Sequence, residues 1–111
     1  MTVLERFLKY IKIDTSSSSL SEETPSTPNQ RLIANQLQEE LTSLGAEVKY
    51  DEEHCYLYAM IKGDESLPKI GFIAHLDTSE DAKGENITPN IINNYNGQQI
   101  TLNTSNGLYP D

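Results

Sequence analysis

The hydrophobic positions near the N-terminus repeat with the period of a helix. In the segment "TVLERFLKYIKI", residues 2–13, apolar side chains recur at spacings of three and four residues, at Leu4, Phe7, Leu8 and Ile11. This spacing places them on one face of an amphipathic helix. The segment that follows, "DTSSSSLSEETPSTPN", is too polar to bury, and we expect a flexible surface loop there.

A second helix is predicted after this loop. Thr27 is a candidate N-cap, Pro28 suits the first helical position, and Gln30 stands where a capping box places its partner. Gly45 is expected to end the helix, because glycine adopts the left-handed conformation at little cost. The predicted buried stripe consists of Ile33, Ala34, Leu37, Leu41 and Leu44.

From residue 46 onward the apolar period changes to two, which predicts strands. The candidates are "AEVKY", "CYLYAMI" and "IGFIAHL" (residues 46–50, 55–61 and 70–76), and "IINNYNGQQITL" reads as a hairpin about Asn96 and Gly97. Two helices followed by strands that are apolar on both faces favour an α/β fold with layered helices and sheet.

Composition narrows the classes of function. The chain has 111 residues, enough for one modest core, and its 8 basic and 17 acidic side chains give a formal charge of −9. That charge repels nucleic acids and anionic membranes, so neither is an expected partner. No apolar run approaches the ~18 residues of a membrane span, and charged residues interrupt the N-terminal region where a signal peptide would be apolar. The single Cys55 favours the cytoplasm.

The candidate site is the pair His75 and Asp77, at the end of the third predicted strand. Residues two apart in a strand share a face, and the carboxyl ends of strands in α/β sheets face the ligand crevice. A neutral imidazole there is a good zinc ligand, and a nearby carboxylate can hold its other ring N–H. The alternative is a histidine satisfied by hydrogen bonds, with Asp77 starting a turn.

Other polar residues are expected to have ordinary roles. His54 and Cys55, as strand neighbours, would face opposite ways, and Cys55 suits a small core position. The serine run 16–19 lacks the context of a nucleophile elbow. A solvated acidic loop is predicted to contain Glu80, Asp81 and Glu85.

Several segments together resemble one family. "GFIAHLDTS" resembles the first metal-ligand motif of the M20 family of zinc-dependent peptidases, and the similarity is greatest to its tripeptide aminopeptidases. "FLKYIKIDTSS", "TPSTPNQRLIANQLQEELTSLG" and "ITPNIINNYNGQQITL" are similar to the opening helix and active-site loop, the second helix and a later insertion. The resemblance covers residues 1 to about 102, in order.

The resemblance implies that His75 ligates one of two zinc ions and that Asp77 is the catalytic-site carboxylate that orients this imidazole. It also implies that Asp14 and Thr15 lie near the rim of the active site. The family's other metal ligands and its general-base glutamate have no counterpart here, and the tail "NTSNGLYPD" does not follow the family pattern. We therefore interpret residues 1–111 as the incomplete N-terminal portion of a catalytic domain. Alone, it is expected to be inactive and to self-associate.

Two other functions fit the same residues. A different M20 enzyme, such as a dipeptidase or a deacylase, would keep the His-x-Asp motif, although the Asn-Tyr-x-Gly insertion favours the tripeptide enzymes. A non-catalytic binding or assembly module that retains half a metal site is the alternative from another class. A stop codon directly after Asp111 would favour the module, whereas an open reading frame that carries Asp-Asp and Glu-Glu motifs would favour the enzyme.

Overall fold

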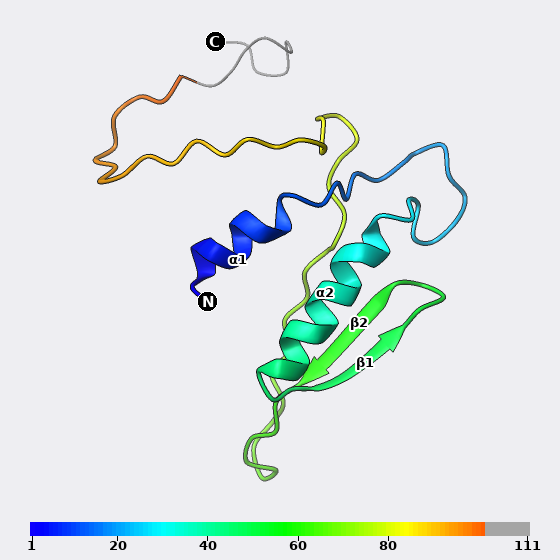
Figure 1. The fold of residues 1–111 in the computed structure, drawn as a ribbon. Coiled ribbons are helices and arrows are strands. Elements are labelled where there is room, and N and C mark those ends of the chain that lie inside the picture. The colour runs from blue at the N-terminus through cyan, green and yellow to red at the C-terminus, as the bar shows by residue number, and fades with distance from the viewer. Residues whose placement is uncertain (102–111) are drawn as a thin grey trace.

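The computed structural model describes residues 1–101 and has a mixed α/β architecture (Figure 1). Its elements are α1 (Val3–Tyr10), α2 (Gln30–Ser43), β1 (Glu47–Asp51) and β2 (Tyr56–Met60). Helix α2 packs against the β1–β2 hairpin, whereas α1 lies to one side. The α/β class is thus confirmed at the level of one helix on a small sheet. None of the helices within residues 1–101 has the length and apolar character needed to cross a membrane.

Helix α1 is confirmed, but it is shorter than the predicted 2–13. A capping box starts it: the Glu5 N–H donates to the Thr2 hydroxyl over 3.2 Å, and the Thr2 N–H donates to the Glu5 carboxylate. None of its residues is buried, and Leu4 and Phe7 on its apolar face are more than half exposed. Apolar packing therefore contributes little to the position of α1.

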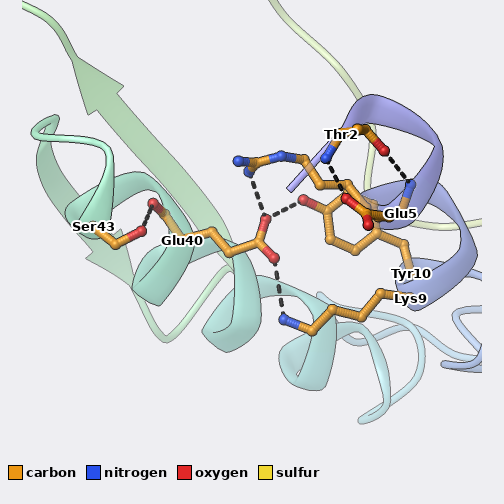
Figure 2. A network of polar contacts seen from close by, with 7 residues as sticks. Thr2, Glu5, Lys9, Tyr10, Glu40 and Ser43 are labelled. Atoms are coloured by element: carbon orange, nitrogen blue, oxygen red, sulfur yellow. Dashed lines mark hydrogen bonds and ion pairs between the residues drawn. The ribbon is translucent and has the colours of Figure 1, made fainter.

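A polar cluster on Glu40 joins α1 to α2 instead (Figure 2). One carboxylate oxygen of Glu40 accepts from Arg6 Nη1 at 3.1 Å and from the Tyr10 hydroxyl, and the other accepts from Lys9 Nζ at 3.1 Å. The Glu40 side chain is only 12% exposed. The hydrogen bond from Tyr10, with smaller contributions from the cations, lowers the pKa of Glu40, whereas burial and Glu40 raise the pKa of Tyr10.

The start of α2 differs from its prediction. The helix begins at Gln30, and Asn29 at the N-cap makes no capping hydrogen bond through its side chain. The Thr27 hydroxyl, predicted to cap the helix, donates to the Ser16 carbonyl over 2.8 Å. Gln30 Nε2 in turn donates to the Ser26 and Thr27 hydroxyls, both at 3.2 Å. The predicted capping box is therefore wrong, because Thr27 and Gln30 bind the preceding loop.

The C-terminal end of α2 matches its prediction. Gly45 has a φ of +87°, in the left-handed region that favours glycine. The Gly45 N–H donates to the Thr42 carbonyl and the Ala46 N–H to the Leu41 carbonyl, both over 3.0 Å. This pair of bonds is a Schellman motif, which satisfies two carbonyls at the helix end.

The small core lies between α2 and the hairpin. Ile33 and Ala34 of α2 are buried, as are Ala46 and Cys55, which confirms the start of the predicted stripe. The antiparallel register pairs Val48 with Ala59 and Tyr50 with Leu57. Of the predicted stripe, Leu44 is 57% exposed, because it is the C-cap residue where the chain leaves the helix. Leu37 and Leu41 are half-buried.

The predicted third strand does not form. Within the described residues, the segment 70–76 belongs to neither strand of the sheet, and Phe72 is 94% exposed. The only ladder contact near it is a parallel bridge between Thr78 and Ser16. A strand requires a hydrogen-bonded neighbour, and β1 and β2 pair only with each other here.

The predicted hairpin about Asn96 is also wrong for the residues described. No strand occurs in the range 91–101. Instead, the Asn96 N–H donates to the Gln98 side chain and the Gln98 N–H donates to the Asn96 side chain, at 3.0 and 3.2 Å. Asn96 and Gly97 therefore form a local turn. Leu102, at the end of the predicted hairpin, and the tail 103–111 lie outside the described residues.

The 111-residue chain is expected to self-associate through its uncovered apolar surfaces. Ile70, Phe72 and Ile73 are each more than 80% exposed, and the outer face of β2 presents further apolar side chains, at Tyr56, Tyr58 and Met60. Sedimentation at about 20 μM should show dimers or larger species. Phe72→Lys should shift the chain toward monomer, whereas Leu20→Lys, which replaces an equally exposed residue in the serine-rich loop, should not. A wild-type monomer with a sharp thermal transition would contradict this expectation.

Candidate metal-binding motif at His75 and Asp77

The structure brings His75 and Asp77 together, although not on a strand. His75 Nδ1 lies 2.7 Å from the Asp77 backbone carbonyl oxygen and 3.1 Å from Asp77 Oδ1. Because both contacts are to acceptors, the ring proton is assigned to Nδ1, which leaves the lone pair of a neutral ring on Nε2. The imidazole is 83% exposed. The ring is therefore in the tautomer whose Nε2 can bind a metal ion.

The serine-rich segment holds the backbone that follows this pair. The Thr78 N–H donates to the Thr15 carbonyl over 3.1 Å, and the Thr78 carbonyl accepts from the Ser17 N–H at 2.8 Å and the Ser17 hydroxyl at 3.0 Å. Two residues further on, the Ser19 N–H donates to Glu80 Oε2 over 2.8 Å, and this bond lowers the pKa of Glu80. The serine run was predicted to be a flexible loop, but the structure pairs it with residues 78–80.

A glycine lies close to the start of the same segment. Asp14 Oδ1 accepts from the Ser16 N–H at 3.0 Å and from the Ser16 hydroxyl at 2.6 Å, and these bonds lower the pKa of Asp14. A Cβ added at Gly84 would approach Ser16 Oγ and Asp14 Oδ1 more closely than van der Waals contact allows. Asp14 and Thr15, which the resemblance places near the active-site rim, thus lie beside residues 78 and 84.

His54 and Cys55 belong to a separate part of the molecule. They lie in the loop that joins β1 to β2, so their predicted position on a strand is wrong. His54 Nδ1 lies 2.9 Å from Asp51 Oδ2, and this carboxylate raises the pKa of His54. Cys55 is buried, which confirms its prediction as a core residue, and its thiol lies 3.6 Å from the Tyr50 hydroxyl.

The described residues can be compared with what a metal site requires. Within 1–101, no group of three His, Cys, Asp or Glu side chains is placed to hold a metal ion. His75 nevertheless has the arrangement typical of a zinc ligand, with one ring nitrogen held by a carboxylate and a backbone carbonyl and the other open. His75 and Asp77 therefore fit one zinc ligand and its support.

Sequence reasoning found His75 and Asp77 but missed the residues that hold them. Ser17 and Glu80 were interpreted as parts of a flexible loop and of a solvated acidic loop. The contacts that Ser17 makes with Thr78, and Ser19 with Glu80, join residues 61 positions apart. The only local signal was the high density of hydroxyl groups in residues 15–19, which is equally typical of an unpaired loop.

Comparison with known proteins shows extensive similarity to one group of peptidases. The chain is 44% identical over 110 residues to the peptidase T of Alkaliphilus oremlandii, which covers 96% of this chain and 27% of that protein. It is 46% identical over 110 residues to the peptidase T of Parabacteroides distasonis and 45% identical over 108 residues to that of Clostridium botulinum. The chain resembles peptidase T.

The likeness to peptidase T has a defined extent. It includes nearly the whole chain, but the chain spans only about a quarter of the length of these curated relatives. No family model matches the chain. The similarity to peptidase T confirms the resemblance found in the sequence motifs, and the activity of the complete protein is a separate question.

Proposed function

We propose that the chain is the N-terminal part of the catalytic domain of a zinc-dependent tripeptide aminopeptidase of the M20 family. The observation that carries the proposal is the 44–46% identity to peptidase T over nearly the whole chain. The contact between His75 and Asp77 supports it independently, because it prepares an imidazole to bind a metal. Cys55 is a free thiol, which accords with a cytoplasmic enzyme.

In this proposal, each residue of the motif has a distinct task. His75 presents the Nε2 lone pair to one of two zinc ions, and Asp77 accepts a hydrogen bond from Nδ1–H and stabilises the positive charge that the ring gains on metal binding. Bound zinc polarises a carbonyl and lowers the pKa of a water molecule, which is the chemistry that peptide hydrolysis requires. The remaining ligands and the general base are supplied by residues outside those described.

The test is hydrolysis by the complete protein. With zinc, it should release the N-terminal residue of tripeptides faster than it cleaves dipeptides or N-acyl amino acids, and a chelator should stop the reaction. The 111-residue chain alone should be inactive with excess zinc, because a catalytic zinc typically needs three protein ligands and the motif supplies one. Preference for dipeptides or N-acyl amino acids would indicate a different M20 enzyme. Turnover by the 111-residue chain that is lost in His75→Ala would contradict the expected inactivity.

A further inference from the structure

The serine-rich segment contacts the candidate site through one peptide group. The Asp77 carbonyl accepts from His75 Nδ1, and the N–H of the same peptide group, at Thr78, donates to the Thr15 carbonyl. A peptide unit is planar, so its carbonyl and N–H point in opposite, fixed directions. The bond to Thr15 therefore sets the direction in which the Asp77 carbonyl faces the imidazole.

Two further contacts restrain the next residues. Both the N–H and the hydroxyl of Ser17 donate to the Thr78 carbonyl, and the Ser19 N–H donates to the Glu80 carboxylate. The backbone is thus held immediately after Asp77 and again three residues later. The 70–76 segment has no strand partner among residues 1–101, whereas the chain directly after the motif is held by these hydrogen bonds.

We propose that Ser17 and Glu80 are positioning residues, which anchor residues 78–80 to the serine-rich segment and thereby keep Asp77 behind His75. The inference deepens the proposed function and rests on it, because the property that these residues set is the metal affinity and basicity of His75. Neither side chain touches the imidazole, so their influence passes through the Asp77–Thr78 peptide group.

Gly84 packs against the same serine-rich segment. Its backbone lies so close to Asp14 and Ser16 that a methyl group would displace one of them. Ser16, which Gly84 approaches, also forms the parallel bridge with Thr78. Residues 14–17 therefore contact both Thr78, through hydrogen bonds, and Gly84, through close packing.

The test uses the complete protein and measures zinc affinity by competition with a chelator, beside kcat and KM. Ser17→Ala removes one hydroxyl donor, and Glu80→Gln removes the charge that holds the Ser19 N–H. Each variant should weaken zinc binding about 3–10-fold and lower kcat by a similar factor, with KM unchanged. Ser17→Thr keeps the hydroxyl and should restore both values. Ser21→Ala is the matched control and should behave as wild type, because the Ser21 hydroxyl lies in the same serine-rich loop but accepts from the nearby Glu23 N–H.

Gly84→Ala is a second, independent perturbation. It leaves every hydrogen-bonding group in place but displaces Asp14 or Ser16, so zinc affinity should fall at least as far as in Ser17→Ala. Unfolding temperatures of the metal-free variants are measured in parallel. A loss of zinc affinity at an unchanged unfolding temperature supports the positioning role. A lowered unfolding temperature without change in zinc affinity would overturn it, because that result describes a loop that is only structural.

Zinc binding by the His75 variant distinguishes a wrong positioning role from a wrong proposed function. If His75→Ala loses zinc while Ser17→Ala and Glu80→Gln bind it as tightly as wild type, the positioning role is overturned and the proposed function stands. If His75→Ala keeps full zinc occupancy, the ligand assignment is wrong and the positioning role is overturned with it.

Discussion

Replacing His75 by alanine in the complete protein should remove bound zinc and peptidase activity together. The substitution deletes the ring nitrogen that carries the metal-binding lone pair, so zinc stoichiometry should fall and kcat/KM should drop more than ~100-fold, beyond the loss expected from removing a supporting residue. Zinc content is measured on the dialysed protein, and folding is verified by circular dichroism. His54→Ala is the matched control, because His54 bonds Asp51 in the hairpin and should leave both values unchanged. Full zinc occupancy in His75→Ala would show that His75 is not a zinc ligand.

Asp77→Asn separates support of the imidazole from a purely structural turn. The substitution keeps the size of the side chain and also the backbone carbonyl, which lies closer to Nδ1 than the carboxylate does. It removes the negative charge that, in the proposed function, stabilises the metal-bound ring. Activity should therefore fall by ~10–100-fold, toward the lower end of that range, while zinc still binds at saturating concentration.

The matched control for Asp77 is Asp81→Asn, the same change on a nearby exposed carboxylate that bonds Ser79. It should leave zinc content and kcat/KM at wild-type values. If Asp77→Asn were also indistinguishable from wild type, Asp77 would serve only to start the turn, a task that asparagine performs equally well.

The candidate site shows what a sequence motif can and cannot predict. The spacing of two residues correctly predicted that His75 and Asp77 lie in contact. The structural basis differs from the one expected, because residues 75–77 belong to no paired strand and the Asp77 backbone carbonyl also accepts from the ring. The anchoring by Ser17 could not be predicted, since the same hydroxyl-rich run is typical of an unpaired loop.

In the fold too, elements set by local interactions were predicted and those set by distant interactions were not. Helical periodicity and Gly45 are local signals, and both helices and the Gly45 end of α2 followed from them. The cap at Thr27 failed because its hydroxyl binds Ser16, eleven residues earlier. The third strand failed because a strand depends on its neighbours more than on its own residues.

Glu40→Ala should release α1 from the rest of the structure. Glu40 alone accepts bonds from Arg6, Lys9 and Tyr10, and the apolar face of α1 is not buried, so no other described contact of comparable strength replaces them. The amides of α1 should lose protection against hydrogen exchange by about tenfold, since the three bonds include two with charged donors. Glu39→Ala, an equal change at the exposed neighbouring position, is the control and should leave protection unchanged.

The pH dependence follows from the direction of the Glu40 shift. Its folded pKa lies below the ordinary 4.5, so the stabilisation of α1 is complete above that value and is lost as the pH falls through the lowered pKa. The raised pKa of Tyr10 sets the opposite limit, because its hydroxyl must remain protonated to donate. The difference in protection between wild type and Glu40→Ala should therefore be constant near neutral pH, shrink in 1 M salt and vanish in acid. A difference that persisted in strong acid would show that apolar packing, and not the Glu40 carboxylate, holds α1.

Helix α1 leads directly into residues 14–17, so the Glu40 cluster also restrains the start of the segment that is hydrogen-bonded to Thr78. Glu40→Ala should therefore weaken zinc binding of the complete protein, but less than Ser17→Ala does.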